Sequence, residues 1–404
     1  MRYSFASRTV SLLSSPLRQI RENARLNSFI SLAEELPAQE LFPVKLLEEA
    51  AQDVLASGPD VLQYGEPEGF RPLREWLIAE WENRKNAMIV PSQVLLTTGT
   101  QQAIDLVVRL MVDEGDSVLV ENPTSPGCLQ VLSMQGARVI PTVSDGNGLL
   151  IHNLEQQMKL HRPKLLFAAP TFSNPTGGVW DLGRRQDVLE LCRRYSVLFV
   201  EDDSYGELDL NLKRGEVHLP SLFALDDGGR GGQVLYIGSF SKTIAPALRT
   251  GWAAGAAPVI EGMTVLKQLA DTQSSTMNQR LLHRLLAGPP FSWHDHLALL
   301  NKEYATRLKL MLELLKRPLW KEVTWRVPEG GMYVWARLPE GLDSAILLKA
   351  ALPKGVAFLP GGLCTAGKEG ASYIRLNFSH PGRDELFLGM NLIGETIAEF
   401  TARS

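Results

Sequence analysis

Between residues 94 and 254 the sequence alternates between short apolar runs and longer amphipathic segments. Seven runs are expected to be strands, at residues 94–97, 117–120, 138–142, 164–168, 197–200, 234–237 and 252–254. Helices are expected between them, for instance at 101–111 and 184–195. Near-continuous apolar strands that alternate with helices are typical of a mostly parallel sheet covered on both faces. The pattern therefore predicts an α/β fold with a mostly parallel seven-stranded sheet.

The segments on either side of this region follow a less regular order. Helices are expected at 16–26, 44–56, 72–81 and 383–402, and over 277–315 with a break near residues 288–290. Short strands are expected at 333–338, 356–359 and 373–378. We therefore predict a large domain over residues 44–290 and a small, discontinuous α+β domain over residues 1–43 and 291–404.

Polar side chains follow the predicted strand 234–237. They are Ser239, Ser241 and Lys242, and Arg249 comes seven residues later. Hydroxyls and a guanidinium suit a phosphate, since both donate hydrogen bonds to its oxygens. A lysine beside them suits pyridoxal phosphate (PLP), which has an aldehyde for the lysine and a ring that withdraws electrons. The alternative is a surface lysine after a strand.

A second candidate phosphate contact lies where strand 94–97 gives way to a helix. Gly99, Thr100 and Gln101 would place backbone N–H groups and a hydroxyl at the helix N-terminus, where anions bind. The alternative is an ordinary turn with Thr100 as the N-cap.

The run Asn-Pro-Thr-Gly-Gly at residues 174–178 follows a further strand end. Asn174, held before a proline, is a stiff donor that suits a phenolate oxygen such as O3′ of PLP. The alternative is a β-turn, in which all these residue types are common.

Three consecutive acids, Glu201, Asp202 and Asp203, follow strand 197–200. A carboxylate at the C-terminal end of a parallel strand points into the ligand crevice. Paired with the pyridine nitrogen of PLP, it keeps that nitrogen protonated and strengthens electron withdrawal by the ring. The alternative is a solvated strand end.

Arg375 lies in the otherwise apolar strand 373–378. A buried arginine is costly unless it is paired with an anion. The α-carboxylate of a substrate, bound through two hydrogen bonds, would be such a partner. The alternatives are an internal salt bridge or an exposed edge position.

In order and spacing these motifs resemble the class I/II, fold-type I PLP-dependent aminotransferases. The likeness is greatest to the 2-aminoadipate aminotransferase-like branch and to the aminotransferase-like domains of chimeric regulators. It runs from about Ser31 to the C-terminus. It includes Leu36-Pro37 through Phe42-Pro43, Gln63-Tyr64 with Gly69, and Gly330-Gly331-Met332.

The resemblance implies a role for each candidate residue. Lys242 would form the Schiff base and move the proton, and Asp202, chosen by its spacing to Tyr205, would pair with the pyridine nitrogen. Other contacts would be those of Asn174 and Tyr205 with O3′, of Gly99, Thr100, Gln101, Ser239, Ser241 and Arg249 with the phosphate, and of Arg375 and Asn174 with the substrate. Tyr64 would reach the phosphate of the other subunit, which implies a homodimer.

The sequence departs from the family pattern at three places. Ser125 stands where a tyrosine usually stacks on the cofactor ring, and Cys364 stands where an aromatic residue is common. Glu34 and Glu35 replace a Gly-Gly pair near the expected substrate entrance. The two carboxylates would either attract a cationic substrate group or face solvent, and we favour solvent.

These features predict an aminotransferase that moves an amino group from an L-amino acid to a 2-oxo acid. One alternative is a PLP-dependent lyase or decarboxylase on the same scaffold, and Ser125 gives it some weight. The other is a PLP-binding sensor domain without turnover. The segment before Ser31 is too short for a winged helix, which favours an enzyme over a regulator.

Composition bounds the partners and the location. A net charge of −4 gives no global reason to expect nucleic-acid binding. No apolar run reaches the eighteen or so residues of a membrane span, and the N-terminus lacks the apolar core of a secretory signal. The three cysteines and seven histidines show neither disulfide density nor metal-ligand spacing. We expect a cytoplasmic protein with small-molecule substrates and no metal.

Overall fold

The computed structural model describes residues 3–9, 20, 22, 29–85, 87–210 and 219–402. Its central sheet has seven strands in the order β2-β10-β9-β8-β7-β3-β4, which confirms the predicted fold class. The strands are β2 (Val94–Thr97), β3 (Ser117–Glu121), β4 (Arg138–Thr142), β7 (Leu165–Ala168), β8 (Leu198–Asp202), β9 (Val234–Ser239) and β10 (Gly251–Ala254). All neighbours pair in parallel except β10, which is antiparallel to both β2 and β9.

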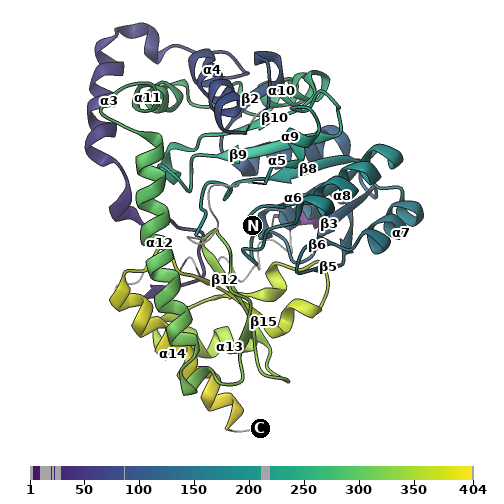
Figure 1. Ribbon diagram of the computed structural model, residues 1–404, viewed down its shortest axis with the longest axis vertical. Coiled ribbons are helices and arrows are strands. Elements are labelled where there is room, and N and C mark those ends of the chain that lie inside the picture. The colour runs from purple at the N-terminus through teal and green to yellow at the C-terminus, as the bar shows by residue number, and fades with distance from the viewer. Residues whose placement is uncertain are drawn as a thin grey trace.

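Helices cover both faces of this sheet (Figure 1). Along β9, Leu235 and Ile237 pack in one apolar cluster, whereas Val234 and Tyr236 pack in another. The first cluster contains residues of α5 (Thr100–Met111), α6 (Pro126–Gln135) and α10 (Ala257–Asp271). The second contains residues of α4 (Arg71–Glu80), α7 (Ile151–His161), α8 (Leu182–Tyr195) and α9 (Leu222–Leu225). Burial on both faces explains why the strand sequence is apolar throughout.

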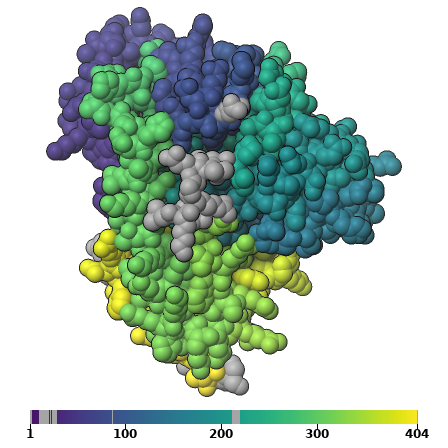
Figure 2. Space-filling view, viewed as in Figure 1, coloured from purple at the N-terminus to yellow at the C-terminus, as the bar shows by residue number. Residues whose placement is uncertain are grey.

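A second sheet of four antiparallel strands lies below the first in Figure 1. Its order is β11 (Thr324–Trp325), β12 (Tyr333–Arg337), β15 (Tyr373–Asn377) and β14 (Leu359–Pro360). Helices α13 (Ser344–Ala351) and α14 (Arg383–Thr401) belong to the same part of the structure. Close to the N-terminus, β1 (Ile30–Ser31) pairs in parallel with β13 (Val356–Ala357). Helix α12 (Trp293–Leu315) extends along both parts, as its green surface in Figure 2 also shows. The division into a large domain over residues 44–290 and a small domain over residues 1–43 and 291–404 stays a prediction.

The remaining elements match or refine the expected pattern. Helix α3 (Val44–Ala56) has the expected bounds, and the long helical stretch is divided into α11 (Thr276–Leu286) and α12. The expected helix at 16–26 lies almost wholly outside the described residues. A small hairpin is formed by β5 (Ser144–Asp145) and β6 (Gly148–Leu149). Short 3-10 helices lie at Gln39–Leu41, Pro59–Leu62, Pro91–Gln93, Pro246–Leu248, Pro318–Trp320, Leu352–Lys354, Gly361–Leu363 and Glu369–Ser372, and a π-helical turn at Trp81–Lys85.

The strand directions bring the candidate motifs to one edge of the large sheet. The carboxyl ends of the parallel strands meet at this edge, where ligands bind in sheets of this kind. Gly251 at the start of β10 pairs with Ser239 at the end of β9 and with Thr97 at the end of β2. The loops after β2, β3, β7, β8 and β9 therefore converge. Among the described helices, none is long and apolar enough to cross a membrane.

Candidate active site

A cavity of about 600 Å³ lies at this edge of the sheet. That volume is within the range of about 300–1,000 Å³ that is typical of small-molecule sites. Most of the predicted site residues line it, from both sheets. They are Thr100, Gln101, Asn174, Asp202, Tyr205, Ser239, Ser241, Lys242, Arg249 and Arg375, and with them Glu34, Glu35, Ser125 and Ser204.

One end of the cavity has the donors that a phosphate needs. Thr100 and Gln101 form the first turn of α5, where the helix N-terminus attracts anions. The N-cap is Gly99 (φ 80°), so the interpretation of Thr100 as the cap is wrong. A side chain at Gly99 would meet the Arg249 guanidinium at 2.4 Å, so glycine leaves room for that arginine. Arg249 Nη1 donates to Ser241 Oγ at 3.4 Å.

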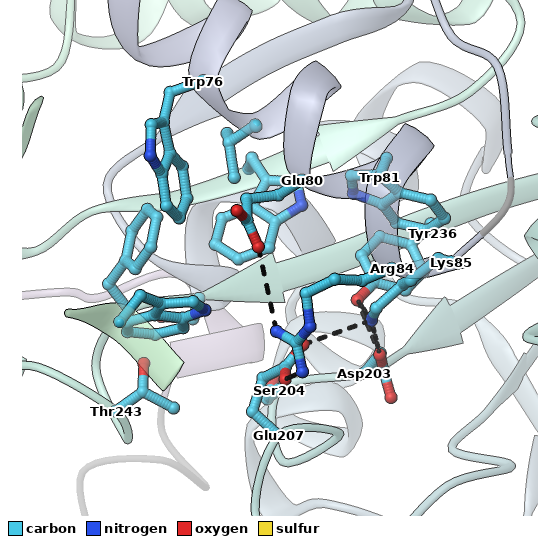
Figure 3. Close-up of a pocket in the computed structure, with 15 residues that line it drawn as sticks. Trp76, Glu80, Trp81, Arg84, Lys85, Asp203, Ser204, Glu207, Tyr236 and Thr243 are labelled. Carbon is cyan, nitrogen blue, oxygen red and sulfur yellow. Dashed lines mark hydrogen bonds and ion pairs between the residues drawn. The ribbon is translucent and has the colours of Figure 1, made fainter. Parts of the chain in front are cut away.

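Of the three consecutive acids, Asp202 is the one that lines the cavity. Asp203 Oδ2 instead accepts from Lys85 Nζ at 2.9 Å and from Tyr236 OH at 2.6 Å, in a separate aromatic-walled pocket (Figure 3). Glu201 accepts from the backbone N–H groups of Leu222 and Phe223. The alternation of side chains along β8 explains why neighbouring acids face opposite ways.

Asp202 is itself held in place. Its Oδ1 accepts from the backbone N of Ser204 at 3.1 Å and from the hydroxyl of the same serine. Burial raises the pKa of Asp202 to about 6, although the bonds from Ser204 act to lower it. The buried Asp202 carboxylate is therefore suited to pair with a cation placed beside it.

Lys242, Asn174 and Tyr205 converge on the middle of the cavity. Lys242 Nζ lies 5.9 Å from the centre of the Tyr205 ring, and Asn174 Nδ2 lies 3.3 Å from Tyr205 OH. Tyr205 OH is also 3.0 Å from Tyr333 OH, a contact from β12 of the smaller sheet. Burial lowers the pKa of Lys242; the positive charges of Arg375 and Arg249 act in the same direction, whereas Glu35 opposes them.

Arg375 is buried and is paired with a carboxylate of this chain. Its Nη1 donates to Glu35 Oε1 at 2.8 Å and to Asn174 Oδ1 at 2.7 Å. Its Nη2 donates to the Ala33 carbonyl at 2.9 Å. The internal salt bridge considered as an alternative for Arg375 is thus present. The expectation that Glu35 only faces solvent is wrong, because its carboxylate pairs with the guanidinium, although the side chain stays 40% exposed to the cavity.

Glu35 interacts with the lysine as well. Lys242 Nζ donates to the Glu35 carbonyl at 2.6 Å and lies 3.9 Å from Glu35 Oε2. Burial acts to raise the pKa of Glu35, but the charges of Arg375 and Lys242 outweigh it and lower the pKa to about 2. Glu35 is therefore ionised at neutral pH.

The other singled-out residues lie around the cavity. Ser125 lines it and serves as the N-cap of α6, accepting from Cys128 N at 3.3 Å. Cys364 is buried, and its carbonyl accepts from Thr124 N at 2.7 Å. Tyr64 is 81% exposed, and it is not among the described residues that line the cavity of its own subunit.

Two residues that sequence reasoning missed support the site. Tyr333 lies at the start of an expected strand, next to Gly330-Gly331-Met332, and its ring centre is 4.1 Å from Arg375 Cζ. Glu121 at the end of β3 accepts from Ser173 Oγ at 3.3 Å and from Trp180 Nε1 at 3.0 Å, and so holds the loop that carries Asn174. A charged residue directly after an apolar strand was the available signal for Glu121.

Comparison with known proteins agrees with this geometry. The sequence profile of aminotransferase class I and II matches residues 29–386. The chain belongs to the class I and II aminotransferase family. It is 36% identical over 385 residues to the 2-aminoadipate transaminase of Thermus thermophilus, covering 95% of this chain and 94% of that one. It is 34% identical to aromatic-amino-acid aminotransferase 1 of Thermococcus litoralis, covering 98% and 94%.

A solved structure of alpha-aminoadipate aminotransferase from Thermus thermophilus, complexed with N-(5'-phosphopyridoxyl)-L-leucine, matches this aminotransferase with a TM-score of 0.89. The sequences are 35% identical, and the match covers 99% of this chain and 98% of that chain. The protein is a PLP-dependent aminotransferase of fold type I, as the sequence predicts. The cavity fits the cofactor, since it has phosphate donors at one end, a buried carboxylate and a lysine.

Proposed function

We propose that Lys242 is the lysine that holds PLP and moves the proton during amino-group transfer. The single observation that carries this proposal is that Lys242, Asp202 and Arg375 line one cavity with the phosphate donors. Thr100, Gln101, Ser239, Ser241 and Arg249 would hold the phosphate, with Gly99 making room for Arg249. Asn174 and Tyr205 would contact O3′, and Asp202 the pyridine nitrogen.

When bound, PLP supplies an aldehyde that accepts the amino group and a ring that stabilises negative charge at the donor's α-carbon. Arg375, with Asn174, would orient the donor by its α-carboxylate. Lys242 Nζ would then remove the proton from the α-carbon of the donor and deliver it to C4′ of the cofactor. The lowered pKa of Lys242 increases the fraction of neutral amine that can accept this proton.

The test is a half-reaction without an acceptor. Purified protein is loaded with PLP, mixed with a panel of L-amino acids, and its denatured supernatant is analysed for pyridoxamine phosphate and 2-oxo acid. We expect the two products in equal amounts for the accepted donors. Ammonia and pyruvate released without pyridoxamine phosphate would instead indicate a lyase, carbon dioxide release a decarboxylase, and a bound donor that never reacts a sensor.

Ser125 predicts weakened cofactor binding. Serine cannot stack on the cofactor ring, and aromatic pairs contribute about 0.5–1.5 kcal/mol. Replacing Ser125 by tyrosine should therefore tighten PLP binding by roughly twofold to tenfold. The same change removes the N-cap of α6, which costs about 1 kcal/mol of stability. Dissociation constants measured by dialysis against PLP check the first effect, and thermal unfolding checks the second. PLP binding that is equal to or weaker than that of the wild type would contradict the expected gain from stacking.

We propose that the active unit is a homodimer in which Tyr64 reaches the phosphate of the partner's site. The Tyr64 side chain is 81% exposed, so it is accessible to a partner subunit. Leu62, two residues earlier, is 70% exposed and would be covered by the same contact. A hydrogen bond to a charged group contributes about 1.5–3 kcal/mol, so Tyr64→Ala should weaken PLP binding by roughly tenfold or more.

Mixing two variants tests the shared site. Tyr64→Ala and Lys242→Ala are each expected to be nearly inactive at limiting PLP. In a hybrid dimer, one site has both residues intact, because Lys242 comes from one subunit and Tyr64 from the other. Random reassociation should restore about a quarter of wild-type activity, since half of the dimers are hybrid and half of their sites are complete. If Tyr64 acts within its own subunit, mixing restores nothing.

We also propose a cytoplasmic location and the two-domain division predicted above. All three cysteines are buried free thiols, in keeping with a reducing compartment. The pairing of β1 with β13 supports assigning the N-terminal segment to the small domain.

A further inference from the structure

Glu35 occupies the place that the proposed function gives to the substrate's α-carboxylate. Its Oε1 lies 2.8 Å from Arg375 Nη1 and 3.0 Å from Asn174 Nδ2, the two residues expected to bind that carboxylate. One guanidinium edge and one amide cannot serve both groups in the same way. The donor must therefore displace the Glu35 side chain, or bind beside it.

The backbone around Glu35 is pinned on both sides. Leu32 N donates to the Ala357 carbonyl, and Asn377 N donates to the Leu32 carbonyl, each at 2.8 Å. Asn377 Nδ2 donates to the carbonyls of Glu34 at 2.6 Å and Leu36 at 3.2 Å. With its backbone held on β15, Glu35 can move only by side-chain rotation. A displaced carboxylate thus stays within the cavity, where its side chain is 40% exposed.

The charges that line the cavity then leave Glu35 without a partner. Arg249 would serve the phosphate, Lys242 the aldehyde and Asp202 the pyridine nitrogen, which leaves Arg375, Glu35 and the neighbouring Glu34 to the amino donor. The α-carboxylate of a donor neutralises Arg375. Glu35, ionised at neutral pH, then faces the rest of the donor as an unpaired negative charge.

We propose that Glu35 selects amino donors with a cationic side chain and disfavours donors with a second carboxylate. This inference rests on the proposed function of the same site. An ammonium or guanidinium on the donor would replace Arg375 as the partner of Glu35. A dicarboxylic donor would place a further carboxylate beside Glu35.

Three donors of matched length test the selectivity. L-Ornithine, L-norleucine and L-2-aminoadipate each have three methylenes and end in an ammonium, a methyl and a carboxylate. In the PLP-loaded wild type we expect kcat/KM to fall in that order. Because a nearby carboxylate attracts an ammonium and repels a second carboxylate, Glu35→Gln should reduce the ornithine to 2-aminoadipate ratio by about tenfold. Glu49→Gln on the exposed face of α3 makes the same charge change elsewhere and should leave the ratio unaltered.

A binding series without chemistry separates this inference from the proposed function. 4-Guanidinobutanoate, adipamate and adipate have nearly the same shape, lack a reactive amine and end in a positive, neutral or negative group. Calorimetric titration of the PLP-loaded wild type should give affinities in that order, and Glu35→Gln should level them.

The outcomes are distinct. If no amino acid reacts but the binding order holds, the proposed function fails and the charge selectivity stands. If donors react but 2-aminoadipate and adipate are preferred, or the ratios survive in Glu35→Gln, the selectivity is overturned and the proposed function stands. The wild-type rankings decide the question even if the variant does not fold.

Discussion

Replacing Lys242 by alanine should lower the rate of amino-group transfer by about 10²- to 10⁴-fold, the usual contribution of a positioned acid–base group. The reason is that Lys242 Nζ is the proposed carrier of the proton between the donor and the cofactor. Single-turnover formation of pyridoxamine phosphate at saturating donor measures this step apart from binding. The cofactor should still bind, since its phosphate contacts are unchanged.

Two controls make the Lys242 result specific. Lys45→Ala removes an exposed lysine of α3 and should leave the rate unchanged. Lys242→Arg keeps the positive charge near the Glu35 carbonyl, but a guanidinium does not deprotonate at neutral pH, so it should be as inactive as alanine. Full turnover in either Lys242 variant would remove Lys242 from the mechanism.

Replacing Arg375 by glutamine should raise KM for both the amino donor and the 2-oxo acid. Removing one partner of a buried, hydrogen-bonded charge pair costs about 2–5 kcal/mol, which corresponds to roughly 30-fold or more in affinity. Steady-state KM values for both substrates measure the effect. A change in KM for one substrate alone would contradict a shared carboxylate site.

The same substitution also leaves Glu35 without its guanidinium, so stability must be separated from binding. The pKa of Glu35 is lowered to about 2, so the pair stabilises the fold above the unfolded pKa of 4.5, and this stability is lost as the pH falls toward 2. Arg375→Gln should therefore weaken the rise in unfolding free energy between about pH 2 and pH 5. Adding Glu35→Gln should restore the stability lost at neutral pH but not the affinity for substrates. A double variant that regains both would show that Arg375 has only a structural role.

The sheet was predictable because its strands are buried on both faces. Runs such as 234–237 are apolar at every position, and helices separate them, so both the strands and their mostly parallel arrangement follow from the pattern. The reversed direction of β10 does not follow, because an apolar strand reads the same in either direction. It depends instead on the short connection between Ser239 and Gly251, which returns the chain along β9.

The candidate site was predictable where a polar residue ends a strand. Asp202, Asn174, Ser239 and Lys242 follow strands whose carboxyl ends meet, so their grouping follows from the fold. The choice of Asp202 over Glu201 and Asp203 rested on family spacing, and the separate contacts of those two neighbours now give it a physical reason.

Glu35 was not predictable from local sequence. Its position depends on the bonds of Asn377 to residues 32, 34 and 36, which are more than 300 positions away along the chain. No periodicity within residues 30–40 reports such a contact. From sequence alone, two adjacent carboxylates are expected to face solvent. Only the long-range bonds to Asn377 turn one of them, Glu35, toward the cavity.

The antiparallel insertion of β10 also has a consequence for how this chain is made. In the sheet, β2 pairs with β10, which leaves the ribosome more than 150 residues later. At about 5–20 residues per second, β2 waits on the order of 10–30 s for its partner during translation. The edge of β2 that pairs with β10 is open over that time, although Leu96 N already has the Glu68 carbonyl as an acceptor. The nascent chain therefore needs another contact to protect the edge of this strand, such as a chaperone or early packing against α5, until β10 is synthesised.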